Sequence, residues 1–277
     1  MTRSNIVGLL CFWALLLPAA AFSKGKERAQ AAVQLQVAPT ELRSDMAYIL
    51  LKTSTAKSGM FPLQHVLMRE PSAQEVANYL AAKQKAYNDA LPEMQKKAKD
   101  SPILTFDQFG FDYQGTPNSF VVISKKFLED GDMRTILLEV RSAKYILYGI
   151  TLGDRGLVTC NCLGTVSFKA KSGVITNIGS LYADKVHKQS PVPNLEDNLG
   201  EQMFQYGFIL GQALVPADAG TMIPLSLKGL PTESAQFEVV EQYYEPGAAG
   251  INRLAPIQGL LGYTKGRPVD LRKSATN

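Results

Sequence analysis

The sequence has few of the residues that most often build catalytic and metal sites: 3 cysteines, 2 histidines and 1 tryptophan in 277 residues. It contains no Gly-x-Ser-x-Gly nucleophile elbow, no glycine-rich nucleotide loop and no His-Glu-x-x-His zinc motif. His65 lies in an apolar strand context and His187 lies among lysines, and neither has a partner at the spacing of metal ligands. The sequence therefore offers no catalytic, cofactor-binding or metal-binding residue, and it favours a protein that is not an enzyme.

The charged residues point to no charged partner. The net charge is +4 and no run of five like charges occurs, so nucleic-acid binding has no support in the sequence. Acidic neighbours such as Glu129, Asp130 and Asp132 supply too few oxygen ligands for a calcium loop and are typical of a solvated turn. No apolar stretch after residue 23 reaches 18 residues, so we expect no further transmembrane helix.

Residues 1–23 have the pattern of a secretory signal peptide. A basic residue precedes an apolar core at 6–17, and small residues after it predict cleavage before Phe22 or Lys24. Cys11 lies inside the apolar core and away from the cleavage site, so lipidation is not expected. An uncleaved signal anchor is the alternative. Because the chain also lacks an Asn-x-Ser/Thr acceptor, the sequence favours export to the periplasm of a Gram-negative bacterium.

The rest of the chain divides where its composition changes. Residues 24–33 are polar and alanine-rich and are expected to form a tether. Residues 184–200 contain two prolines and several turn formers, which predicts a linker. We expect the main domain at 34–183. Residues 201–277 carry less regular β patterns, and they either complete that domain or form a separate one.

One helical insertion is predicted at 72–99. Pro71 precedes Ser72, and Glu75 stands three residues further on, which is a Ser-x-x-Glu capping box. Apolar residues then recur at spacings of three and four, so they share one face of a helix. Pro92 cannot continue the hydrogen-bond ladder, which predicts either a kink or a second short helix.

Strand patterns dominate residues 103–183. Six short segments rich in Val, Ile, Tyr, Phe and Thr are separated by turn residues, which favours an antiparallel arrangement over βαβ units. Ser172-Gly173 predicts a hairpin between the strands on either side, and Lys265-Gly266 predicts another near the C-terminus. The expected fold class is mainly β (α+β): an antiparallel β-sandwich or barrel with one helical insertion.

Residues 119–183 resemble exported β-sandwich proteins of unknown function from Gram-negative bacteria. In those proteins a strand ends in a Pro-Gly-x-Tyr-type turn, and a later segment reads Phe-x-Val-x-x-Gly-x-Ile-x-x-Ile-Gly. The matching positions here are Tyr145, Phe168, Gly173, Ile175, Ile178 and Gly179, with Ala143-Lys144 in place of Pro-Gly. The resemblance implies a prealbumin-like or carboxypeptidase-regulatory-like sandwich and an envelope location, and it brings no catalytic residues.

Cys160 and Cys162 are the only cysteines after the leader. In an oxidising compartment such a pair most simply forms a disulfide. Residues two apart in an extended strand lie roughly 6.6 Å apart between Cα atoms, so the bond requires a bend at Asn161. We predict an intramolecular bond that stabilises the fold only weakly. Two buried free thiols on one sheet face, and a redox or metal site, are the alternatives.

Three functional hypotheses follow. The leader, the density of strands and the missing motifs favour a non-enzymatic β-sandwich module of the cell envelope, which has a structural role or binds an envelope protein or ligand. The second hypothesis is a thiol redox or copper-handling protein that uses Cys160 and Cys162. The third is a hydrolase with dispersed catalytic residues, which a deep pocket with clustered carboxylates or with His65 would favour.

Overall fold

The computed structural model describes residues 32–54, 57–58, 61–98, 102–115, 117–122, 127–130, 133–152, 157–183, 212–243, 250–265 and 267–274. These residues divide into two compact units, one within 29–78 and 115–277 and the other within 79–114. The predicted signal peptide at 1–23 and the predicted linker at 184–200 lie outside the described residues, as does His187.

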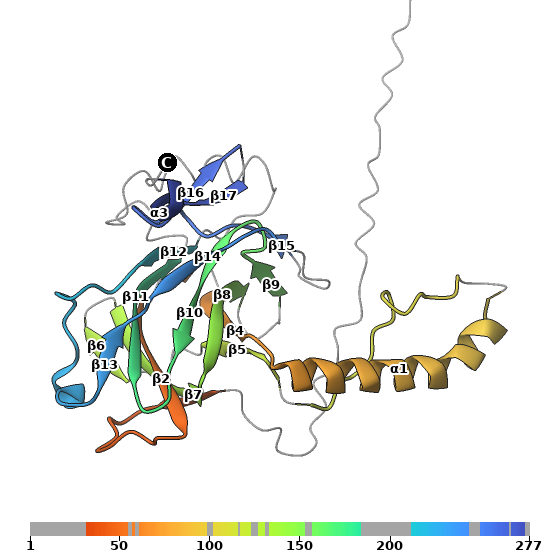
Figure 1. Cartoon of the computed structure of the whole chain (residues 1–277), viewed down its shortest axis with the longest axis horizontal. Coiled ribbons are helices and arrows are strands. Elements are labelled where there is room, and N and C mark those ends of the chain that lie inside the picture. Colours follow the sequence, from red (N-terminus) through yellow and green to blue (C-terminus); the bar gives the residue numbers. More distant parts are fainter. Residues whose placement is uncertain are drawn as a thin grey trace, which may run out of the picture. The chain divides into compact units, whose positions relative to one another are not determined.

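The larger unit contains a sheet of seven strands and a sheet of eight (Figure 1). In the seven-stranded sheet the order is β1-β7-β2-β11-β12, while β6 pairs with β7 and β13 pairs with β11. Its strands are β1 (Ala32–Leu35), β2 (Met46–Ser54), β6 (Leu128–Asp130), β7 (Met133–Arg141), β11 (Ile175–Ala183), β12 (Gln212–Val215) and β13 (Thr232–Ser234). β1 begins inside the segment that the sequence assigned to the tether, because Ala32 and Val33 pair with β7.

In the eight-stranded sheet the order is β14-β10-β8-β4-β3. β5 pairs with β4, and β9 pairs with both β8 and β15. Its strands are β3 (Lys57–Ser58), β4 (Phe61–Arg69), β5 (Ser119–Val122), β8 (Ala143–Leu152), β9 (Leu157–Cys160), β10 (Thr165–Ala170), β14 (Phe237–Val240) and β15 (Gly250–Ile251). A separate hairpin, β16 (Leu261–Thr264) with β17 (Arg267–Asp270), precedes the short helix α3 (Leu271–Ser274). This hairpin confirms the turn predicted at Lys265, whose φ is 50°.

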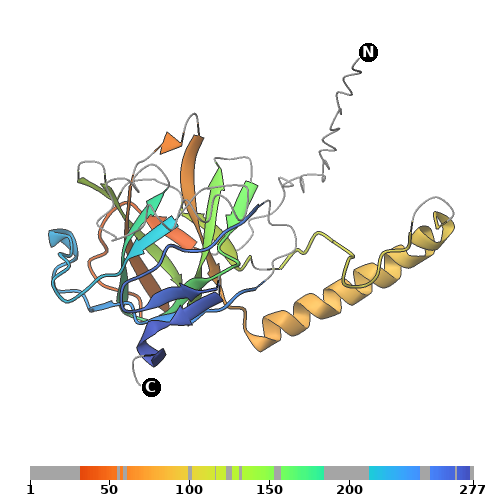
Figure 2. The same cartoon turned by 90° about the horizontal axis from the view of Figure 1, so that it is seen from above.

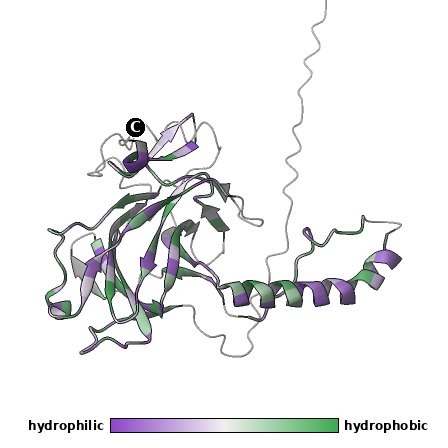
Figure 3. Cartoon of the chain, viewed as in Figure 1, coloured by the Kyte–Doolittle hydropathy of each residue, from purple (hydrophilic) through white to green (hydrophobic). Residues whose placement is uncertain are grey.

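The two sheets share one apolar core. β2 and β7 contribute Ile49, Leu51, Ile136 and Leu138, and the facing strands contribute Leu67, Leu147, Val166 and Phe168; all are fully or nearly fully buried. Hydrophobic and hydrophilic residues alternate along several strands in Figure 3, as expected where one face of a strand packs inward. The mainly β fold with one long helix confirms the fold class expected from the sequence.

The hairpin predicted at Ser172-Gly173 is wrong. β10 and β11, on either side of this turn, belong to different sheets: β10 pairs with β8 and β14, and β11 pairs with β2, β12 and β13. Gly173 has a φ of 68° and its amide donates to Met46 O, so the turn carries the chain from one sheet to the other. A turn signal predicts that the chain reverses, but the partner of each strand depends on distant residues.

The pairing is also less uniform than expected. β11 runs parallel to β2 and to β13, and β15 runs parallel to β9, whereas the other described pairs are antiparallel. β12 and β13 join the seven-stranded sheet, and β14 and β15 join the eight-stranded sheet, so the described strands between residues 212 and 251 belong to the same two sheets as the rest of the larger unit.

Helix α1 (Ala73–Lys96) confirms the predicted insertion and its start. Ser72 Oγ accepts from the Glu75 amide at 3.2 Å, and the Glu75 carboxylate accepts from the Ser72 amide at 2.9 Å, which is the expected capping box. The helix continues through Pro92, so the second short helix does not form. Among the described residues, no helix combines the length and the apolar character needed to cross a membrane.

Candidate functional site

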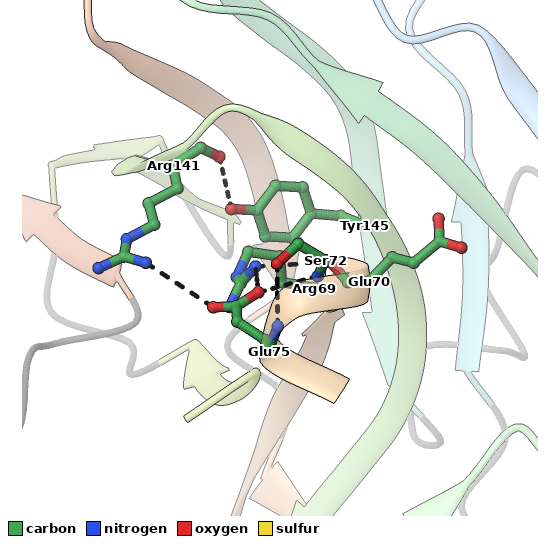
Figure 4. Close-up of polar contacts among 6 residues, drawn as sticks. All are labelled: Arg69, Glu70, Ser72, Glu75, Arg141 and Tyr145. Carbon is green, nitrogen blue, oxygen red and sulfur yellow. Dashed lines mark hydrogen bonds and ion pairs between the residues drawn. The ribbon is translucent and has the colours of Figure 1, made fainter. Parts of the chain in front are cut away.

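A charged cluster surrounds the first turn of α1 (Figure 4). Arg69, at the end of β4, donates from Nη1 and Nη2 to the two carboxylate oxygens of Glu75, at 2.8 and 2.7 Å. Arg141 Nη1 lies 3.8 Å from the same carboxylate, and the Tyr145 hydroxyl donates to the Arg141 carbonyl at 2.7 Å. The fork-to-fork geometry between Arg69 and Glu75 is the strongest arrangement of this ion pair.

The electrostatics of this cluster favour a fixed ion pair. Hydrogen bonds from Arg69, and secondly from the Ser72 amide, hold the pKa of Glu75 at about 2. The hydrogen bond to Glu75 in turn raises the pKa of Arg69, whose side chain is nearly buried. Because both Glu75 oxygens already accept from these donors, the carboxylate is a poor proton acceptor at neutral pH. The cluster therefore fastens the start of α1 to β4, and we assign it no catalytic role.

A second polar group of side chains crosses the buried interior of the larger unit. His65 Nε2 lies 2.7 Å from Thr53 Oγ1, and His65 Nδ1 lies 2.6 Å from Gln212 Nε2. Gln212 Oε1 accepts from Asn161 Nδ2 at 2.7 Å, and Asn161 Nδ2 also donates to the Leu147 carbonyl at 3.2 Å. All four side chains that form this buried chain are 5% exposed or less. We call Thr53, His65, Gln212 and Asn161 the buried polar chain.

The buried polar chain keeps His65 neutral. Burial lowers the pKa of His65 from 6.5 to about 4, because the charged imidazolium would lose its hydration. With Gln212 Nε2 donating to Nδ1, the proton of the neutral ring stands on Nε2 and is donated to Thr53. No described carboxylate contacts His65, so the ring lacks the acidic partner that orients a catalytic histidine. The arrangement is that of a structural histidine.

Cys160 and Cys162 flank one member of this chain, Asn161. Their sulfur atoms lie in close contact, and their Cα atoms are 5.1 Å apart, so the bend that the sequence required at Asn161 is present. The Cys160 carbonyl accepts from the Asn252 amide, and the Cys162 carbonyl accepts from the Tyr243 amide, both at 2.7 Å. The turn is thus a junction at which β9 meets the segments around residues 243 and 252. Both cysteines are at most 1% exposed.

One small hollow lies among the described residues of the seven-stranded sheet. It has a volume of about 10 Å³ and lies beside Lys52, Asn177 and Met222. That volume holds about one water molecule. No carboxylate lines this hollow, and His65 lies elsewhere in the buried polar chain. The hollow therefore does not meet the criterion set for a hydrolase. Within the described residues, no group of three His, Cys, Asp or Glu side chains could hold a metal ion.

Aromatic contacts join the helix of the smaller unit to the segment that follows it. We call its described residues, 79–98 and 102–114, the aromatic segment. Tyr79 packs against Phe111 and Tyr113, with ring centroids 5.6 and 5.2 Å apart. Tyr87 packs against Phe106 and Phe109, with ring centroids 5.8 and 5.4 Å apart. The tilted and edge-to-face geometries are those that aromatic rings prefer.

Polar contacts accompany these rings in the aromatic segment. The Tyr87 hydroxyl donates to the Leu104 carbonyl at 3.0 Å, and Lys83 Nζ donates to the Asp107 carbonyl at 3.3 Å while lying 4.9 Å above the Phe106 ring. The segment 102–114 thus folds back along α1, as the two views in Figures 1 and 2 show.

No residue of the aromatic segment is buried. Tyr79, Leu80, Ile103 and Leu104 remain 39% to 47% exposed. Most protein helices are stabilised by packing of an apolar face, since propensity alone is marginal at this length. An apolar face that stays half-exposed is available for contact with a macromolecular partner.

The structure brings together residues that the sequence did not connect. Gln212 and Thr53 complete the surroundings of His65, and Arg69 completes the capping box, yet none of the three was singled out. The sequence signal that could have indicated the buried contact of His65 with Gln212 was a polar residue inside an apolar strand, as in "LQHVLM" and "QALV". Glu129 and Asp130 lie in β6, and Asp132 lies outside the described residues.

Comparison of the chain with family models, with curated proteins and with solved structures finds no match to any of them.

Proposed function

We propose that this is an exported, non-enzymatic module of the cell envelope, in which a β-sandwich scaffold carries a helical element that binds a partner protein. The observation that carries this proposal is the aromatic segment, whose rings pack on one another and leave every described side chain partly exposed. The resemblance of residues 119–183 to exported sandwich proteins and the predicted leader supply the location, the periplasm of a Gram-negative bacterium.

The exposed face has the composition of a binding surface. Protein interfaces are enriched in Tyr and Phe and depleted of charge at their centre. The charges of α1 instead pair locally, as in Lys85–Asp89 at 2.6 Å and Lys96–Glu93 at 2.6 Å. Leu80 and Lys85 lie about 140° apart around the helix, so the apolar and charged faces are distinct. We propose that the partner offers an apolar groove to the face that contains Tyr79 and Leu80.

The thiol redox and copper-handling alternatives have less support. A redox or copper-binding thiol must be reached by a partner or by the metal, and the environment of both cysteines is apolar and closed. Val66 and Tyr148 pack against them with Ile251 at the edge. The turn's hydrogen bonds to residues 243 and 252 further favour a structural role for Cys160 and Cys162.

The proposal is tested by photo-crosslinking in the producing cell. A photoreactive amino acid is placed at Leu80 in one variant and at Lys85 in a matched control on the charged face. We expect a discrete protein adduct from position 80 and much less from position 85. A second variant, Leu80→Asp, should remove the adduct formed from a probe at Tyr79 while far-UV circular dichroism stays unchanged. Equal crosslinking from both faces, or none from position 80, would overturn the binding role.

The location is tested separately by sequencing the N-terminus of the protein recovered from the periplasmic fraction. We expect it to begin at Phe22 or Lys24. Recovery of a chain that begins at Met1 in the membrane fraction would establish an uncleaved signal anchor instead.

A further inference from the structure

The seven-stranded sheet carries a second apolar layer on the face turned away from the shared core. The six buried members of this layer are Tyr48, Leu50, Phe127, Leu137, Ile175 and Leu227. Two segments cover it: residues 35–46 pack through Leu35, Ala38, Leu42 and Met46, and residues 218–230 pack through Leu227 and Leu230. Both segments therefore lie over the same face of the same sheet.

These covering segments hold the most exposed large apolar side chains of the described chain. Val37 is 78% exposed, Met222 is 81% exposed and Leu225 is 87% exposed, whereas the next in rank is 47% exposed. Ile223 adds a further half-exposed side chain beside Met222. Single exposed apolar residues are ordinary on a protein surface. Here, however, the three most exposed large apolar side chains all lie on the two segments that cover one face of the sheet, and this clustering requires an explanation. We call Val37, Met222 and Leu225 the apolar tips.

The loop that carries two of the tips is held in place. Asp218 Oδ1 accepts from the Gly220 amide at 3.0 Å and from the Thr221 hydroxyl at 2.8 Å. After Leu225, Leu227 inserts into the apolar layer and is only 1% exposed. Because the loop begins with a hydrogen-bonded turn and Leu227 anchors its other end in the apolar layer, Met222 and Leu225 need little further ordering, which reduces one of the usual costs of binding.

We propose that this face lies against a phospholipid bilayer and that the three apolar tips insert into its interfacial region. The tips are 78% to 87% exposed, so most of each side chain projects from the surface, and only Met222 lies beside the small hollow of about 10 Å³. A bilayer accepts projections of any shape, whereas a protein partner must supply a matching pocket for each.

The size of the apolar area also favours a bilayer over a second copy of the chain. Each tip offers roughly 60–120 Å² of apolar area, so three offer at most roughly 350 Å². A stable protein dimer buries about 800 Å² on each partner. The tips fall well short of that, but their insertion suffices for weak and reversible membrane association.

Basic and acidic side chains are equally numerous around the apolar tips. The basic side chains on the covering segments and beside Met222 are Arg43, Lys52 and Lys228, and the acidic ones are Glu41, Asp45 and Asp218. With equal numbers of each sign, attraction to anionic headgroups contributes little. Binding should therefore depend on insertion and should differ little between neutral and anionic bilayers or between low and high salt.

The experiment is co-sedimentation of the purified protein with vesicles of phosphatidylcholine, alone or mixed with phosphatidylglycerol. We expect half of the protein to sediment at on the order of 1 mM accessible lipid in both cases. Met222→Ser combined with Leu225→Ser should weaken this binding at least about tenfold. Val121→Ser is the matched control, since Val121 is half-exposed on β5 in the other sheet. It should bind as the parent does.

A spectroscopic reporter tests insertion directly, because Trp13 is the only tryptophan of the chain. Met222→Trp in a Trp13→Phe background should show a blue shift of its emission when vesicles are added, and Val121→Trp in the same background should not. Absence of sedimentation by the parent protein, or equal sedimentation by the double variant, would overturn the proposal. So would concentration-dependent dimerisation that the double variant abolishes, since the tips would then be a contact between copies.

Discussion

Acidification should destabilise this protein through a single buried side chain, His65. The ring is 2% exposed and lies between Thr53 and Gln212, and burial lowers its pKa from 6.5 to about 4. In the unfolded chain the imidazole binds a proton near pH 6.5, whereas in the folded protein it does so only near pH 4. Between these values the unfolded state binds more protons, so stability rises with pH and is lost as the pH falls.

The magnitude follows from the two pKa values. Relative to pH 7, the His65 contribution should lower the free energy of unfolding by about 2 kcal/mol at pH 5 and by about 3 kcal/mol at pH 4. Above the unfolded pKa of 6.5 the stabilisation is fully present. Such a loss is a large fraction of the total free energy of unfolding, which is roughly 5–15 kcal/mol for most domains.

The measurement is urea unfolding followed by far-UV circular dichroism at a series of pH values, for the parent protein and for His65→Gln. A glutamine amide offers both a donor and an acceptor toward Thr53 and Gln212 but does not titrate in this range. At neutral pH the variant should be less stable by about 1–2 kcal/mol, because its hydrogen bonds are less well placed.

The decisive quantity is the difference between the two pH profiles. Other titrating groups, including Glu75, are present in both proteins, so their contributions cancel. The advantage of the parent protein over His65→Gln should shrink, and then reverse, as the pH falls below about 6. Parallel profiles from neutral pH down to about pH 4 would refute the claim that His65 is buried in its neutral form.

Two further predictions concern the backbone and the cysteine pair. Gly179→Ala should destabilise the protein by at least about 2 kcal/mol more than Gly229→Ala. Both glycines have a φ near +95°, but only a Cβ at position 179 would overlap Val215 O. Chemical denaturation measures the two costs, and equal costs would show that the structure relieves the clash. Dithiothreitol should lower the melting temperature by no more than about 3–6 °C, since the loop between Cys160 and Cys162 is so short that its closure contributes only about 1.6 kcal/mol. Thiol labelling with mass spectrometry checks the starting state, and modification of both cysteines without reductant would show that no bond forms.

Features that depend on neighbouring residues could be predicted from the sequence. The capping box of Ser72 and Glu75 spans three residues, and its hydrogen bonds form as expected at the start of α1. The strand segments and the final hairpin were predicted for the same reason, because the alternation of side chains and the chemistry of a turn are properties of adjacent residues. The bend that brings Cys160 and Cys162 together could likewise be inferred from the covalent geometry of one intervening residue.

Features that depend on distant residues could not be predicted. The turn at Ser172 and Gly173 was found, but the strands beside it join different sheets, because the hydrogen-bonding edges available to β10 and β11 belong to strands far along the chain. His65 and Gln212 are 147 positions apart, so no local pattern announces their contact. The sequence by itself determined the elements and the polarity of their faces. Only the tertiary structure decided which polar groups meet and which apolar side chains stay exposed, since buried donors and acceptors must find partners wherever the packed chain provides them.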